Sequence, residues 1–249
     1  WSDEADSEAF QKSCVLAILV NLVCHYIGEE FERRVGLLAR DSKSVLKAAP
    51  HKSWQRMRTK AFDDGAYYVG DEYAHPKVQY VKDPLRASLA ASDVAAQLKD
   101  WEALQESDDF RVVGLKNTFA MDDAEAREAT NGMMQMLANV EYTARDANDE
   151  PLTFGKMVAD EAGFAKAVAA CKGAAPELAN DVDEIAVPIL KKPELSERRV
   201  ELLAEVQFHL AYYVEQREQT HVWFQLLRAA DLQALNVDCL HYRDADGEA

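Results

Sequence analysis

The sequence predicts an α+β fold: a mixed central β-sheet of about five strands, flanked by helices and preceded by an N-terminal helical extension. Three observations support this fold class. Helical patterns lie at both ends of the chain, and stretches of period-two alternation between them are typical of strands. Hydrophobic residues make up 48% of the 249 residues, which is ample for a buried core. Internal repeats and low-complexity tracts are absent from the sequence.

The first predicted element is a helix over residues 8–49, ended by Pro50. It begins with an apolar run, Cys14 to Ile27, that is shorter than the roughly 18–20 residues needed to span a bilayer. We therefore expect no transmembrane segment and interpret the run as a buried helix. The alternative is that the run is a docking surface for a protein partner.

The remaining elements follow in order along the chain. Helices are predicted over 51–65, 92–105, 152–171 and 211–235. Strands are predicted within 81–91, 110–120, 133–142 and 200–210. The predicted organisation is an N-terminal extension over 1–48, one domain over 49–235 and an acidic tail over 236–249.

Charge and cysteine content restrict the partners and the compartment. The 44 acidic residues outnumber the 28 basic ones, and the net charge of −16 disfavours binding to nucleic acid. None of the four cysteines forms a CxxC pair, and none has a histidine at metal-ligand spacing. Free thiols predict a reducing, intracellular compartment, either the cytoplasm or an organelle.

Two short segments carry residues suited to phosphates. Lys52, Arg56 and Lys60 recur every four residues, so on a helix they share one face that is able to bind a triphosphate. In KDPLRAS, Asp83 is suited to Mg²⁺ and Arg86 to a phosphate. The alternatives are a solvated helix face paired with acidic residues, and an Asp-Pro turn with a surface ion pair.

The strand within 200–210 presents polar side chains on one face. Glu205, Gln207 and His209 alternate with apolar residues, and strand pairing would bring further polar residues of 133–142 beside them. Such a face is either exposed to solvent or the floor of a site. Leu137 and Leu203 on the same face indicate partial burial, which favours a cleft.

Taken in order, these segments resemble the RelA/SpoT-like nucleotidyltransferase fold of the (p)ppGpp synthetase family and its protist relatives. The resemblance covers about residues 45–230. The matching features are the basic helix, Asp83 and Arg86 in KDPLRAS, Asn131 and Gly132, the EVQ strand at 205–207, and His221 with Trp223 in the following helix.

The resemblance implies roles for these residues. Asp83 and Glu205 would be catalytic and would hold Mg²⁺, with Glu205 also acting on the acceptor hydroxyl. Lys52, Arg56 and Lys60 would contact the phosphates of ATP, and Arg86 would clamp a phosphate. The implied cofactors are therefore Mg²⁺ and ATP, if the ancestral site is retained. His221 and Trp223 would brace the strand that carries Glu205.

Several positions depart from the family pattern. KDPLRAS has no glycine before Arg86, Met133 stands where the family has a tyrosine, and Phe208-His209 replace an arginine and a threonine. We therefore expect a divergent RelA/SpoT-like domain without alarmone synthetase activity, acting as an interaction, accessory or nucleotide-sensing module. The alternative is an enzyme, a Mg²⁺-dependent pyrophosphate- or nucleotidyl-transferase using ATP.

Overall fold

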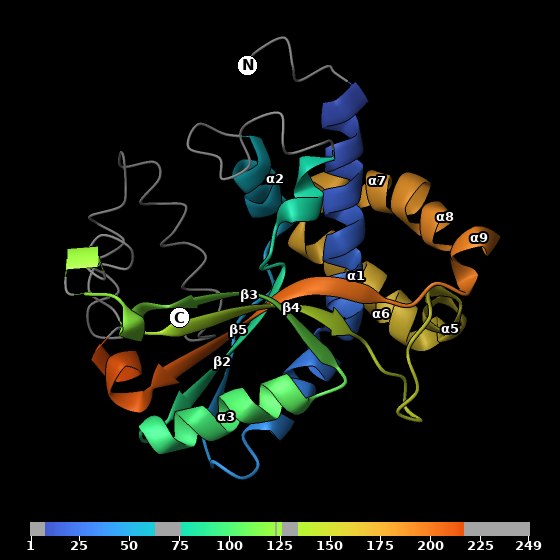
Figure 1. Cartoon of the computed structure of the whole chain (residues 1–249). Coiled ribbons are helices and arrows are strands. Elements are labelled where there is room, and N and C mark those ends of the chain that lie inside the picture. Colours follow the sequence, from blue (N-terminus) through green and yellow to red (C-terminus); the bar gives the residue numbers. More distant parts are fainter. Residues whose placement is uncertain (1–7, 63–75, 123, 126–133, 217–249) are drawn as a thin grey trace, which may run out of the picture.

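The computed structural model describes residues 8–62, 76–122, 124–125 and 134–216. A mixed five-stranded sheet lies at its centre, with helices packed around it (Figure 1). The strands are β1 (Val45–Ala48), β2 (Leu85–Ala91), β3 (Phe110–Asn117), β4 (Met136–Thr143) and β5 (Glu201–Leu210). The α-helices are α1 (Glu8–Leu38), α2 (Trp54–Phe62), α3 (Val94–Glu106), α5 (Phe154–Ala159), α6 (Glu161–Ala174), α7 (Ala179–Asp181), α8 (Val187–Leu190) and α9 (Pro193–Ser196).

The predicted α+β class with about five strands is confirmed. The strand order is β1-β2-β5-β4-β3, with β2 and β5 parallel and the other neighbours antiparallel. The alternation seen in the sequence sets the two faces of the sheet: β4 alternates strictly between buried and half-buried residues. Because β5 lies between β2 and β4, its side chains have neighbours on both sides.

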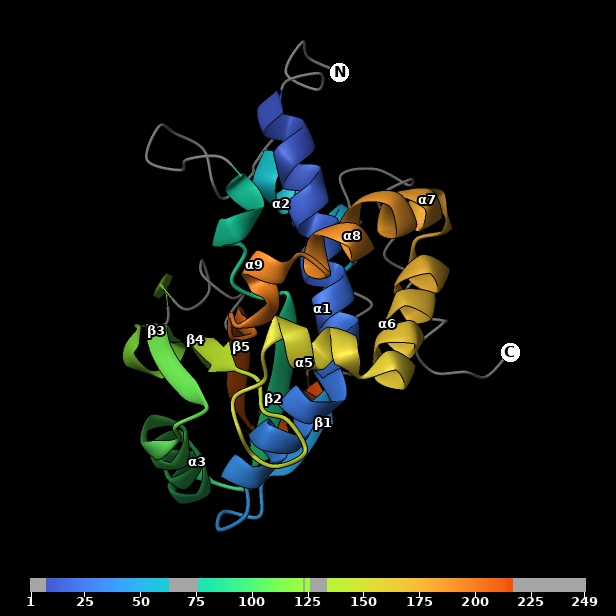
Figure 2. The same cartoon turned by 90° about the vertical axis from the view of Figure 1, so that its right-hand side faces the viewer.

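The apolar face of the sheet packs against α1 and α3. Phe31 of α1 lies 5.1 Å, between ring centroids, from Tyr142 of β4, and Trp101 of α3 lies 6.1 Å from Phe208 of β5. Figure 2 shows α6, α7 and α8 beyond α1, so that α1 runs between the sheet and an outer helical layer. The core residues of α1 include Leu22, Ile27 and Val35, each at most 1% exposed.

The N-terminal helix is shorter than predicted. It ends at Leu38, and residues 45–48 form the edge strand β1 in place of the last helical turns. The reversal has Lys43 in the left-handed region at φ 61°, and the Ser42 hydroxyl accepts a hydrogen bond from the Ser44 amide. Ser42 also donates to Asp100 of α3, so a contact distant in sequence fixes the turn.

By length and composition alone, the part of α1 over Gln11–Leu38 would be able to cross a membrane. The same test is passed by core helices, and α1 carries many of the buried residues of the central cluster. Ion pairs also anchor it: Arg34 donates to Glu30, Asp109 and Asp149, and Arg145 donates to Asp109. These contacts tie α1 to the start of β3 and to the turn after β4.

The helix predicted over 152–171 is two helices. Asp160 separates α5 from α6, because its side chain accepts a hydrogen bond from the Gly163 amide and so caps α6. The 92–105 helix is confirmed as α3, with Asp93 as its N-cap. Residues 211–216 after β5 are helical, whereas the rest of the predicted final helix, the acidic tail, Asn131, Gly132, Met133, His221 and Trp223 lie outside the described residues.

Candidate functional site: the polar sheet face and its lysine-bound aspartate

The polar face of the sheet is built by register. Arg86 of β2 lies directly beside Glu205 of β5, which in turn lies beside Asn139 of β4. One step along, Ser88, Gln207 and Leu137 are neighbours in the same way. Since neighbouring residues of paired strands point to the same side of a sheet, these two rows form one surface.

A hydrogen-bonded network runs along β5 on this face. The Gln207 amide donates to the Glu205 carboxylate at 2.5 Å, and its carbonyl oxygen accepts from the Ser88 hydroxyl at 3.2 Å. His209 Nε2 donates to the same Gln207 oxygen at 3.1 Å. The donors therefore lead from His209 and Ser88 through Gln207 to Glu205, which fixes the orientation of the Glu205 carboxylate. Ser88 belongs to KDPLRAS but was not predicted as part of this face; its period-two spacing from Arg86 is the sequence signal that could have placed it here.

Arg86 contributes a buried donor to the same face. Its Nε atom is buried and has no hydrogen-bond partner among the described residues. Leaving a buried donor unsatisfied costs about 1–3 kcal/mol, and more for a charged group. An acceptor oxygen from a ligand would remove that cost, so Arg86 remains a candidate anion-binding residue.

Asp83 lies just before β2 and is held by two lysines. Lys52 Nζ donates to Asp83 Oδ2 at 2.6 Å, and Lys60 Nζ lies 3.0 Å from both carboxylate oxygens. The side chains of Lys52 and Asp83 are 6% and 12% exposed, whereas that of Lys60 is 29% exposed. The three side chains form a compact cluster with one net positive charge.

Electrostatic interactions within this cluster keep the Asp83 carboxyl ionised. Burial opposes the charge on Asp83, but Lys52 and Lys60 outweigh it and hold the pKa of the carboxyl below its usual value. Burial lowers the pKa of Lys52, and the nearby charge of Lys60 adds to this effect against the attraction of Asp83. Asp83 is therefore a carboxylate at neutral pH.

The basic residues reach their places differently from the prediction. The helix predicted to begin at His51 begins at Trp54, so Lys52 lies before it and does not share a helical face with Lys60. Lys52 is placed by its backbone: its amide donates to the Pro84 carbonyl, and its carbonyl accepts from the Asn21 side chain. Arg56 lies on α2, one turn before Lys60, and is exposed.

The two predicted metal ligands do not form an open oxygen pair. Both Asp83 oxygens contact lysines, and Glu205 pairs in register with Arg86, three positions past Asp83. Within the described residues, no group of three or more histidine, cysteine or acidic side chains is placed to hold a metal ion. This arrangement does not fit Mg²⁺ held by both carboxylates unless the lysines leave Asp83.

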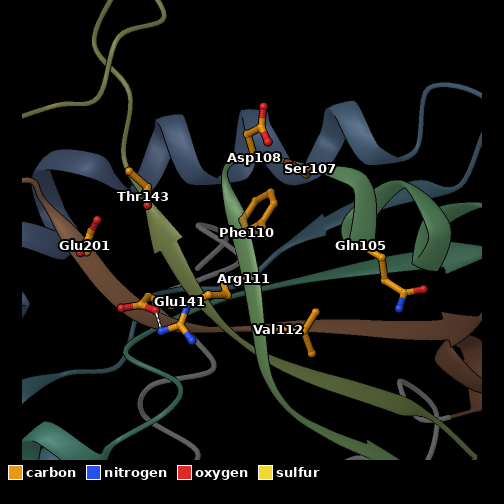
Figure 3. Close-up of a pocket in the computed structure, with 9 residues that line it drawn as sticks. All are labelled: Gln105, Ser107, Asp108, Phe110, Arg111, Val112, Glu141, Thr143 and Glu201. Atoms are coloured by element: carbon orange, nitrogen blue, oxygen red, sulfur yellow. Dashed lines mark hydrogen bonds and ion pairs between the residues drawn. The ribbon is translucent and has the colours of Figure 1, made fainter.

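Two hollows lie at the other end of the polar face. The larger, of about 650 Å³, is lined by residues around the start of β3, where Arg111 and Glu141 form an ion pair (Figure 3). The smaller, of about 250 Å³, is mostly apolar and lies between α1, α2 and the strands, with Pro84 and Leu203 in its wall. Neither includes one of the six predicted site residues, although Pro84 follows Asp83 directly.

The fold is similar to that of small alarmone synthetases. Small alarmone synthetase 2 from Bacillus subtilis matches with a TM-score of 0.47 and 11% identity, over 90% of this chain and 92% of that one. Small alarmone synthetase 1 from B. subtilis, bound to its product pppGpp, matches with a TM-score of 0.44 and 11% identity, over 89% and 93%. A GTP pyrophosphokinase family protein from Streptococcus pneumoniae matches with a TM-score of 0.45 and 11% identity, over 99% and 92%.

No protein-family model and no curated protein sequence matches the chain. At this level of identity and TM-score, similarity does not carry an activity from one protein to another. We therefore base the functional proposal on the chain's own residues.

Proposed function

We propose that this chain is a nucleotide-binding module that does not synthesise alarmones. The observation that carries the proposal is Arg86, whose buried Nε lacks a partner among the described residues on a polar face beside Glu205. A phosphate oxygen is the acceptor that a guanidinium binds best. The motif order makes a nucleoside triphosphate such as ATP the expected source of that phosphate.

Local charge supports an anionic ligand. Lys52, Lys60 and Arg86 carry three positive charges, and Asp83 and Glu205 carry two negative ones, so this region is positive in a chain with a net charge of −16. Phosphate groups are therefore attracted here and repelled elsewhere. Lys60 is the more exposed lysine of the pair and is the one that a ligand reaches first.

The hydrogen-bond partners of Asp83 and Glu205 support nucleotide binding without phosphoryl transfer. Asp83 is bonded to two lysines, and Glu205 accepts from Gln207, so both act as partners of protein donors. One departure from the family pattern supports the same conclusion. His209 replaces a family residue and lies in the polar network, where it contacts Gln207. The departure at Phe208 is structural, because its ring is fully buried on the apolar face against Trp101.

The second candidate function is Mg²⁺-dependent pyrophosphate or nucleotidyl transfer from ATP. It is favoured by the row of Arg86 and Glu205, with Asp83 just upstream. When bound, Mg²⁺ would neutralise phosphate charge, and Asp83 and Glu205 are the residues that would hold it once the lysines had turned to the phosphates. Lys52, Lys60 and Arg86 would then orient the nucleotide.

Titration calorimetry with ATP, with and without Mg²⁺, tests the proposal. We expect binding by the wild-type chain and weaker binding by R86M. The matched control is R111M, because Arg111 lies on the same sheet face but is 73% exposed and paired with Glu141. Absence of binding at millimolar ATP, or equal weakening in R111M and R86M, would contradict the proposal. A nucleotide product that appears only with Mg²⁺ would favour the second function.

A further inference from the structure

The smaller of the two hollows is a pocket that the proposed nucleotide site does not use. Its volume is about 250 Å³, whereas one water molecule occupies about 30 Å³ in the liquid. Voids larger than a water molecule are few in a close-packed protein interior. Sites for drug-sized ligands are larger, at about 300–1,000 Å³. The pocket therefore has room for one ring or a short chain.

Apolar side chains from three segments form most of its wall. Leu16 and Val20 come from α1, Met57 comes from α2, and Val78 and Val81 come from the segment that leads to β2. All five belong to, or pack against, one hydrophobic cluster that is separate from the central core. Such a wall offers few hydrogen bonds to water, so an apolar group that displaces the water binds favourably.

The polar face of the sheet forms the rest of the wall. Leu203 of β5 pairs with Glu141 of β4, and it lies two residues before Glu205 on the same face. The pocket therefore adjoins the row of Arg86 and Glu205 without including either residue.

Hydrogen bonds fix the backbone around the pocket. The Val81 amide donates to the Val78 carbonyl at 3.0 Å, and the Lys52 amide donates to the Pro84 carbonyl at 2.8 Å. Both bonds hold the segments that lead to α2 and β2. A ligand would therefore enter a preformed pocket with little reorganisation.

Carboxylates lie where the two hollows meet. Glu141 and Glu201 line both hollows, and Asp108 lines the larger. Among the described residues that line them, Arg111 is the only basic one, and it binds Glu141 (Figure 3). The Glu201 side chain makes no hydrogen bond or ion pair within the described part of the chain. Negative charge is thus in excess beside the apolar pocket, and it attracts a cation.

We propose that this pocket binds an organic cation, a primary amine attached to an aromatic ring or a short alkyl chain. The apolar part enters the pocket, and the ammonium group pairs with Glu201. The apolar wall disfavours a free inorganic cation, which would lose its water there. The carboxylates disfavour phosphate, so this site is separate from the one proposed for the nucleotide.

NMR of the full chain with phenethylamine tests the site. At up to about 10 mM, a range suited to so small a ligand, we expect shifts of the Leu16, Val20 and Leu203 methyl signals and nuclear Overhauser effects from the ligand ring to them. Phenethyl alcohol, which keeps the ring without the charge, is expected to bind more weakly, and phenylpropionate not to bind. Absence of these Overhauser effects, or equal binding of the three compounds, would overturn the proposal.

Two pairs of variants locate the two parts of the ligand. Leu16→Trp fills the pocket and is expected to abolish binding, whereas Gln11→Trp adds the same ring at an exposed position of α1 and is expected to keep it. Glu201→Gln is expected to weaken binding of the amine about two- to fivefold, as loss of an exposed ion pair does. Its control is Glu197→Gln, at an exposed position outside both hollows. Equal affinities within either pair would contradict the site.

Discussion

The two faces of the central sheet come from the same strands and behave in opposite ways. On the apolar face, Ala138, Val140, Val206 and Phe208 are completely buried under α1 and α3. On the polar face, the residues between them are half-buried and held by hydrogen bonds such as that from Gln207 to Glu205. One face is therefore specified by burial of area, and the other by pairing of polar groups.

This difference separates stability from function. Burial of apolar groups has no directional requirement. Because the side chains are closely packed, however, the apolar face tolerates only substitutions that keep its volume. Polar groups on the other face depend on particular partners, and Arg86 Nε lacks one among the described residues. The apolar face is thus held mainly by packing, whereas the polar face carries a charged donor that a ligand is able to satisfy.

The largest expected effect comes from Phe208→Ala on the apolar face. The ring is fully buried against Trp101, and removing it leaves a cavity that costs about 3–5 kcal/mol of unfolding free energy. Chemical denaturation measures the loss. A change below about 1 kcal/mol would mean that the face is not packed as described.

Asp83→Asn tests the buried ion pair that lies just before β2. It leaves the Lys52 charge buried without a carboxylate, at a cost of about 3 kcal/mol. The matched control is Glu29→Gln, which breaks the exposed pair with Lys166 and is expected to change stability little. Equal losses in the two variants would refute a special role for the buried pair.

The loss of stability caused by Asp83→Asn is expected to depend on pH. Because Lys52 and Lys60 hold the pKa of Asp83 below its ordinary value of 3.8 despite burial, the ionised carboxylate stabilises the fold above that pH. This contribution is lost as the pH falls through the folded-state pKa. The stability difference between wild type and D83N should therefore narrow below about pH 4, as followed by denaturation at several pH values. A difference that stays constant would contradict the assignment.

Lys60→Met is expected to change binding more than stability. Its side chain is 29% exposed and Lys52 still pairs with Asp83, so the fold is retained. Loss of one phosphate contact should weaken ATP binding by about tenfold, which corresponds to about 1.4 kcal/mol. Calorimetry measures it, and unchanged affinity would remove Lys60 from the site.

The smallest effect is expected for Gln207→Ala on the polar face. Its bonds to Glu205, Ser88 and His209 are only part-buried, so water can replace it, at a cost of about 0.5–1 kcal/mol. Denaturation compares it directly with Phe208→Ala, the adjacent residue on the opposite face. Losses of similar size would abolish the distinction between the faces.

Strong periodicity made much of the fold predictable. The alternation in β4 and β5 fixed which residues share a face, and Asp93 marked the start of α3. The strand β1 was missed, because Val45–Ala48 continues an amphipathic helical pattern and the turn before it depends on Asp100, distant in sequence. The break at Asp160 had a local signal, since an aspartate before Glu161 is a typical helix cap.

The site was predictable in its parts but not in its pairing. Spacing identified Lys52 and Lys60 and placed them on one helical face, whereas backbone bonds to Pro84 and Asn21 hold Lys52 outside the helix. That Asp83 binds both lysines follows from packing between segments far apart in the chain. The contact between His25 of α1 and His51, which lies before α2, has no sequence signal, because it depends on how the two segments pack against each other.

Binding of a nucleotide without transfer is tested most directly by ³¹P NMR. The chain is mixed with ATP, a guanine nucleotide and Mg²⁺, and the phosphate signals are followed over time. We predict that the ATP signals broaden on addition of the wild-type chain, less so with R86M, and then persist. Unperturbed ATP signals, or signals of AMP and a pyrophosphorylated guanine nucleotide, would contradict the proposed function.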